Sequence, residues 1–85
     1  MPIISRFLGV VIAMYFNGHN PPHFHAKYGS LEAEIQINTG AISGFLPPRV
    51  LSLVQEWRNL HIQELLDDWE KCQRHQEVSE IEPLE

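Results

Sequence analysis

The residues best suited to chemistry are three histidines in one short segment, His19, His23 and His25, with the spacing His-x-x-x-His-x-His. If residues 23–28 form a β-strand, successive side chains point to opposite faces, so His23 and His25 share a face and lie about 6–7 Å apart. Two imidazoles at that distance can converge on one metal ion or one phosphate group. The two prolines before His23 stiffen its connection to His19, and a ligand or catalytic group has to be held in place. The spacing therefore predicts a site on this segment.

Two basic residues could assist such a site. Lys27 is predicted to share the strand face of the histidine pair, where it would add positive charge. Arg6 lies in an apolar segment that could border the histidine strand, and arginine binds phosphate and carboxylate groups bidentately. Each residue also has a purely structural interpretation. The histidines and Lys27 could form a solvated polar face, and Arg6 could form a surface ion pair with Glu32 or Glu34.

The first half of the chain, residues 1–46, has the pattern of an antiparallel sheet. Strands are expected at residues 3–7, 10–16, 23–28, 31–37 and 41–46, where apolar, β-branched or alternating residues are bounded by turn signals. Gly29-Ser30 suits a two-residue hairpin turn. The alternation places on the core side Phe24, Ala26, Tyr28, Leu31, Ala33, Ile35 and Ile37. The pattern predicts a β-meander of four to five strands.

Residues 47–75 have a helical pattern that begins at a Pro-Pro pair. Two stripes at helical spacing are mainly apolar, the first with Val50, Val54 and Trp57 followed by His61, the second with Leu65, Leu66, Trp69 and Cys72. The apolar centre drifts between the stretches, which predicts either one bent helix over 48–74 or two helices broken near Asn59. Residues 76–85 are predicted to be an extended acidic tail pinned by Ile81 and Leu84. The expected fold is α+β, with one face of the sheet covered by the C-terminal helix or helices.

Composition places these elements in one small domain, residues 1–85. The lone cysteine, Cys72, allows no intrachain disulfide, which favours a reducing, cytoplasmic compartment. The apolar run 10–16 is far shorter than the roughly 20 residues that span a bilayer, so no membrane anchor or signal peptide is expected. Residues 1–46 hold two basic and two acidic residues, while residues 47–85 hold four and nine, so the net charge of −5 belongs to the second half (4 − 9 = −5). The histidine-bearing half is therefore not repulsive to phosphate.

Motifs along nearly the whole chain resemble those of a known family. The most specific is His-Asn-Pro-Pro-His-Phe-His-Ala at residues 19–26, and others are found at residues 4–9, 14–16, 46–49, 56–57 and 81–84. Together they resemble the bacterial family catalogued as domain of unknown function forty-one-sixty. The resemblance implies a small cytoplasmic protein that acts as the toxin of a toxin–antitoxin pair, with functional positions at His19, His23, His25 and Arg6. Many members of that family carry an acidic residue before the first histidine, where Gly18 stands here, and a basic pair before the tail, where Val78-Ser79-Glu80 stands.

Three functions fit these observations. In the first, the protein is a toxin that cleaves RNA without a metal or other cofactor; one histidine takes the 2′-hydroxyl proton, another protonates the leaving oxygen, and Arg6 and Lys27 hold the phosphate. In the second, His19, His23 and His25 bind zinc or another divalent transition metal, for hydrolysis or for structure. In the third, the protein is a non-enzymatic module that pairs with a small antitoxin-like protein.

Overall fold

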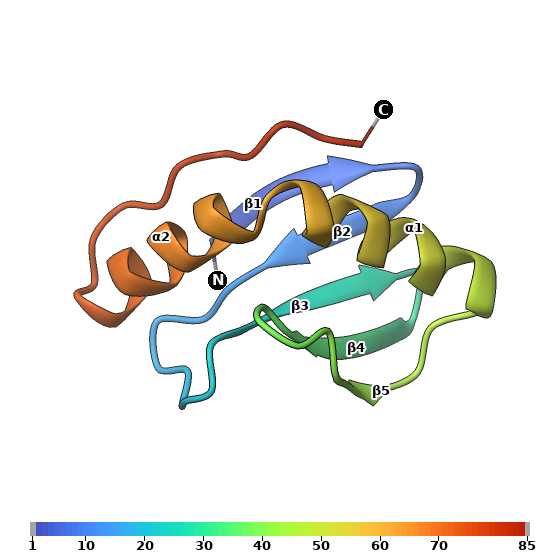
Figure 1. Ribbon diagram of the computed structural model, residues 1–85, viewed down its shortest axis with the longest axis horizontal. Coiled ribbons are helices and arrows are strands. Elements are labelled where there is room, and N and C mark those ends of the chain that lie inside the picture. Colours follow the sequence, from blue (N-terminus) through green and yellow to red (C-terminus); the bar gives the residue numbers. More distant parts are fainter. Residues whose placement is uncertain (1, 85) are drawn as a thin grey trace.

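Five consecutive strands form one antiparallel sheet, and two helices follow them in the computed structural model, which describes residues 2–84 (Figure 1). The strands are β1 (Ile3–Phe7), β2 (Val10–Ala13), β3 (His23–Tyr28), β4 (Leu31–Gln36) and β5 (Ile42–Gly44), and the helices are α1 (Pro48–Leu60) and α2 (Ile62–Gln73). Each strand pairs with its neighbours in the chain, in the order β1-β2-β3-β4-β5. The predicted α+β meander is confirmed.

The second strand is shorter than the predicted strand 10–16. It ends at Ala13, which pairs with His25 on β3. If this register continued, Phe16 would lie opposite Pro22, and a proline has no N–H group to donate to a sheet ladder. The chain therefore leaves the sheet after Ala13 and forms a loop over residues 14–22. The strands predicted at 31–37 and 41–46 are also shorter, ending at Gln36 and spanning only Ile42–Gly44.

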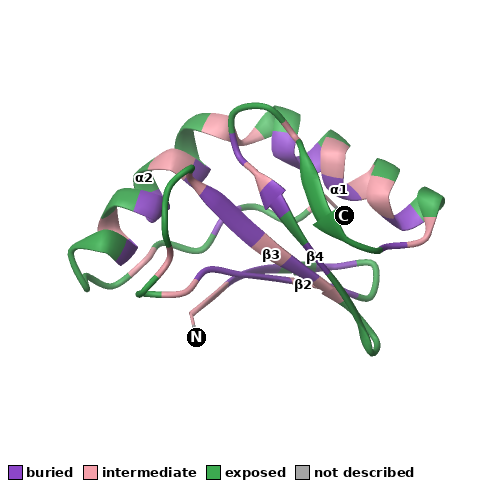
Figure 2. Ribbon diagram, turned by 90° about the horizontal axis from the view of Figure 1, so that it is seen from below, coloured by how far each residue is buried: buried purple, intermediate pink, exposed green. Residues whose placement is uncertain are grey.

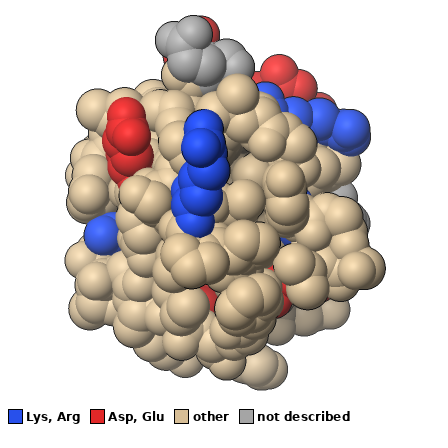
Figure 3. All heavy atoms as spheres, turned by 90° about the vertical axis from the view of Figure 1, so that its right-hand side faces the viewer, with Lys and Arg blue, Asp and Glu red and all other residues tan. Residues whose placement is uncertain are grey.

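One face of the sheet packs under the helices, as predicted (Figures 1 and 2). Most of the expected core residues of the β3–β4 hairpin are buried, and they meet buried residues of α1 and α2; the cluster includes Phe24, Ala26, Ala33, Ile35, Val54, Trp57 and Leu65. Tyr28 and Leu31, which were also predicted to face the core, are each 36% exposed. They flank the turn of the β3–β4 hairpin. That end of the molecule is largely uncharged (Figure 3).

The helical half consists of two helices, the second of the two predicted alternatives. The break lies at His61, two residues beyond the expected Asn59, where the backbone leaves helical geometry with φ −132° and ψ 26°. Trp57 and Leu65 are both fully buried. At about 100° per residue, a continuous helix would turn Leu65 about 80° away from the direction of Trp57. The break at His61 lets both apolar stripes face the core.

The C-terminal tail returns along β1, as Figure 1 shows. The backbone N–H of Ile81 donates a hydrogen bond of 2.8 Å to the carbonyl of Ile4, and the indole Nε1 of Trp57 donates one of 2.8 Å to the carbonyl of Glu82. Ile81 is only 4% exposed, and Leu84 packs against the core, so the predicted pinning of the tail is confirmed. Within residues 2–84, neither helix has the length and apolar character needed to cross a membrane.

Candidate functional site

The first residues of β3 bring His23 and His25 together. Their ring centroids are 5.4 Å apart with an angle of 66° between the ring planes. The alternation of strand side chains places both rings on one side, as predicted from the spacing. The structure thus confirms that the two histidines share one face of β3.

Each imidazole is held in orientation by a hydrogen bond between its Nδ1 and an oxygen atom of the protein. The Nδ1 of His23 lies 2.9 Å from the backbone carbonyl oxygen of Pro21, and the Nδ1 of His25 lies 2.9 Å from a carboxylate oxygen of Glu32. A carbonyl oxygen and a carboxylate only accept hydrogen bonds, so Nδ1 must carry the proton in both rings. In a neutral imidazole the lone pair is then on Nε2. Both histidines are therefore prepared to offer Nε2 to a ligand.

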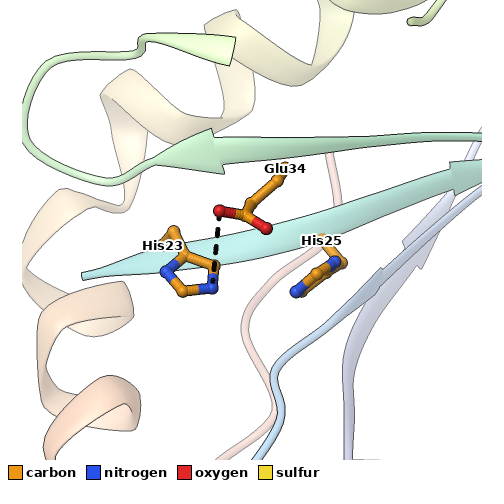
Figure 4. Close-up of side chains that lie close together, drawn as sticks. All are labelled: His23, His25 and Glu34. Atoms are coloured by element: carbon orange, nitrogen blue, oxygen red, sulfur yellow. Dashed lines mark ion pairs between the residues drawn. The ribbon is translucent and has the colours of Figure 1, made fainter. Parts of the chain in front are cut away.

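Glu34 completes a group of three potential ligands (Figure 4). It is the cross-strand partner of His25 on β4, and its carboxylate lies 3.8 Å from the Nε2 of His23. One ligand atom from each of His23, His25 and Glu34 lies within 4.8 Å of the others. Within residues 2–84, this is the one group of three or more His, Cys, Asp or Glu side chains spaced closely enough to hold a metal ion.

The three side chains open into a hollow of about 350 Å³ beside the loop that connects β2 to β3. His19, exposed on that loop, lines the same hollow but is not one of the three clustered side chains. The other lining residues are polar or small, namely Tyr15, Asn17, Gly18, Asn20, Pro21 and Gln36. The structure therefore gathers all three predicted histidines around one hollow and groups only two of them with a carboxylate.

Helix α2 packs against His23 and against the loop beside the hollow. The indole of Trp69 packs against the imidazole of His23 with 5.0 Å between ring centroids, and His23 is only 9% exposed. The imidazole of His23 therefore does not belong to a solvated polar face. The loop also packs on Trp69, because a Cβ atom at Gly18 would come within 2.8 Å of the indole ring. The side-chain amide of Gln73 donates a hydrogen bond of 3.1 Å to the carbonyl of Gly18.

The two predicted basic residues lie outside this hollow. Arg6 is on β1, and β2 separates β1 from the histidine strand, so the expectation that its strand borders the histidines is wrong. Arg6 lines a different hollow beside the C-terminal tail. Lys27 is on β3, and its ammonium group lies 5.9 Å from the centroid of the Tyr15 ring. The residues that line the histidine hollow include no lysine or arginine.

Two carboxylates of the site, those of Glu32 and Glu34, were not recognised from the sequence as parts of it. The sequence contains a signal for them, because a two-residue turn at Gly29-Ser30 fixes the hairpin register. Counting outward from the turn pairs Lys27 with Glu32 and His25 with Glu34, as the structure shows. The negative charges of these carboxylates beside the two imidazoles favour a cation over an anion.

The comparisons with known proteins agree with the motifs. A family model described as Domain of unknown function (DUF4160) matches residues 9–70, which include the whole histidine hollow and Trp69. No curated protein and no solved structure matches the chain. Since the family model covers most of the sequence, the chain belongs to this family, whose function is unknown.

Proposed function

We propose that the protein binds one divalent transition-metal ion through the Nε2 atoms of His23 and His25 and the carboxylate of Glu34. The observation that carries the proposal is the mutual approach of one ligand atom from each residue to within 4.8 Å. The hydrogen bonds on both Nδ1 atoms support it, because metal-bound histidines almost always donate their other ring N–H to a carboxylate or a carbonyl.

Only a small adjustment is needed to close the site. Zinc–ligand distances of 2.0–2.1 Å place tetrahedral ligand atoms about 3.3 Å from one another. The separations of up to 4.8 Å must therefore shorten by as much as about 1.5 Å. The side chain of Glu34 is 47% exposed and can rotate, whereas that of His23 is packed against Trp69. We expect the carboxylate to move toward the two imidazoles when the ion binds.

The ligand set suggests a catalytic metal rather than a purely structural one. Structural zinc sites are usually closed by four protein ligands, whereas two histidines and one glutamate leave a fourth position for water or substrate. A bound zinc ion would lower the pKa of that water to about 7 and so supply hydroxide near neutral pH. The three side chains line the hollow, where His19 and the amides of Asn17 and Gln36 could hold a polar substrate. We therefore propose a metal-dependent hydrolase.

A metal-free ribonuclease would use the same two imidazoles, and the pair of oriented Nε2 atoms favours it as the second candidate. The hollow is less well suited to an RNA substrate, because an RNA phosphate bound there would lie beside the negatively charged carboxylates of Glu32 and Glu34. The lining contributes no lysine or arginine to offset them. A bound divalent cation removes this difficulty, so the metal site is the better-supported proposal.

Titration of purified protein with Zn²⁺ by isothermal calorimetry tests the proposal. We expect near one equivalent of tight binding at pH 7.5 and weaker binding in acid, because the ligands must be deprotonated. His23→Ala and Glu34→Ala should each abolish tight binding. His19→Ala should retain it, as should the control His75→Asn, which removes an imidazole outside the hollow from a residue with a left-handed φ of 56° that asparagine tolerates. Absence of binding by the wild type, or unchanged binding by Glu34→Ala, would refute the site.

The role of toxin in a toxin–antitoxin pair is a further proposal that rests on the family resemblance. Induced expression without a partner protein should arrest bacterial growth, and His23→Ala or His25→Ala should restore growth while the protein stays folded. Normal growth with the wild type would refute the toxin role and leave the metal site intact. Arrest by a variant that has lost zinc binding would show that toxicity does not require the metal.

A further inference from the structure

Glu32 lies outside the three proposed ligands but is in direct contact with one of them. Its carboxylate oxygen is 2.9 Å from the Nδ1 of His25. The cross-strand partner of Glu32 is Lys27, so the carboxylate reaches diagonally along the hairpin to His25. The imidazole of His25 is further confined by the ring of Tyr15, which meets it edge-on with 4.4 Å between centroids. The hydrogen bond therefore joins a carboxylate to a ring that has little freedom to turn.

We propose that Glu32 is a positioning residue for the metal, forming a carboxylate–histidine–metal relay through His25. This inference rests on the proposed metal site. The carboxylate accepts a hydrogen bond from the Nδ1 N–H and so keeps the Nε2 lone pair of His25 directed into the hollow. It also makes the imidazole a more basic ligand, as carboxylates do when they support metal-bound histidines.

The two histidines are supported unequally. His23 donates to the neutral carbonyl oxygen of Pro21, whereas His25 donates to an ionised carboxylate. Together the charges of Glu32 and Glu34 equal and oppose that of one divalent cation. With Glu32 included, the site is neutral when it holds a divalent ion, and it is negatively charged when it is empty or holds a monovalent cation. A divalent ion is therefore favoured.

A matched control exists elsewhere in the chain. Glu64 accepts a hydrogen bond of 2.6 Å from the Nδ1 of His61, in a pair that belongs to none of the metal-sized groups among residues 2–84. Removal of either carboxylate should leave the Nδ1 N–H of its histidine without this hydrogen-bond acceptor. Only removal of Glu32 should change zinc affinity.

The first test measures zinc affinity by competition with a chromophoric chelator at pH 7.5. Loss of a carboxylate that supports a metal-bound histidine typically costs 10–100-fold in affinity, so Glu32→Ala should weaken zinc binding by about that factor. Glu32→Gln, whose amide oxygen still accepts a hydrogen bond from the Nδ1 N–H but carries no charge, should have a zinc affinity between those of the wild type and Glu32→Ala. Glu64→Ala should match the wild type, and one equivalent should bind in every case.

The second test detects the tautomer of His25 in the metal-free protein by ¹⁵N NMR of the imidazole nitrogens. The wild type should show mainly the form protonated at Nδ1, and Glu32→Ala should shift the ring toward protonation at Nε2. This readout is insensitive to a general loss of stability, which urea unfolding measures separately.

The outcomes separate the two proposals. A wild type that binds zinc, with equal affinity in Glu32→Ala or an unchanged tautomer, overturns the role of Glu32 and leaves the metal site standing. A wild type that binds no zinc overturns the metal site, and the relay with it.

Discussion

Replacement of Gly18 by alanine tests how tightly the loop beside the hollow packs against α2. A Cβ atom at this position would lie 2.8 and 2.9 Å from two ring carbons of Trp69. Carbon atoms in ordinary contact are about 3.5–4.0 Å apart, so the loop or the indole would have to move by about 0.7–1.2 Å. Trp69 is buried against His23, and the loop is hydrogen-bonded to Gln73, so neither can give way freely.

Overpacking of this kind typically costs about 1–3 kcal/mol. For a domain of this size, each kcal/mol lowers Tm by about 4–8 °C. Gly18 is not among the positive-φ glycines, so the backbone accepts alanine and the cost reports the contact with Trp69. The free energy of unfolding should be measured in urea by circular dichroism, with the exposed neighbour Asn17→Ala as a control that changes stability by less than about 0.5 kcal/mol.

A double-mutant cycle isolates the contact between position 18 and the indole. Trp69→Phe provides a smaller ring, so Gly18→Ala should cost less in that background, with a coupling of about 0.5–3 kcal/mol. A Gly18→Ala protein as stable as the wild type, or strictly additive effects in the cycle, would refute the packing argument. The same overlap implies that an acidic side chain at this position would require a different placement of the tryptophan.

Two further predictions concern α2 and the tail. Burial raises the pKa of the Asp68 carboxyl above 3.8, so the native state holds its proton to higher pH than the unfolded state does, and stability should fall as pH rises from 3.8 through the raised pKa. The amide of Asp68→Asn can still accept the hydrogen bond from the Ser79 N–H. This variant should flatten the pH dependence of stability and raise the urea midpoint at pH 7. A pH dependence as steep as in the wild type would exclude Asp68 as the source of that dependence. Ile81→Ala should cost about 2–5 kcal/mol in urea unfolding, because the residue is only 4% exposed and packs in the core. A cost below about 1 kcal/mol would show that the tail is not held by this contact.

Local patterns in the sequence were sufficient to predict the antiparallel sheet and the shared face of the histidine pair. Alternation and turn signals are short-range, and they predicted the β3–β4 hairpin together with the shared face of His23 and His25. The same hairpin register pairs Glu34 with His25, so a full cross-strand count would have identified Glu34 as part of the site. The predicted meander was also sufficient to exclude Arg6 from the histidine site, because the strand order places β2 between β1 and the histidine strand.

Contacts between distant parts of the chain could not be predicted in the same way. The burial of His23 depends on Trp69, which belongs to a helix far along the sequence. The close approach of Gly18 to the same indole depends on how α2 packs beside the loop. A helical pattern predicts which residues face a core, but it does not specify which strand or loop they meet. For this reason, the packing of α2 against His23 and the loop became visible only in the folded chain.

The position of a bound ion tests the central claim most directly. Crystals grown with Zn²⁺ should show one anomalous peak at the zinc absorption edge within about 2.0–2.2 Å of the Nε2 of His23, the Nε2 of His25 and a carboxylate oxygen of Glu34. The Nδ1 hydrogen bonds of both histidines should persist in that structure. Zinc bound only at His61 or His75, or held by His19 in place of Glu34, would contradict the proposed site.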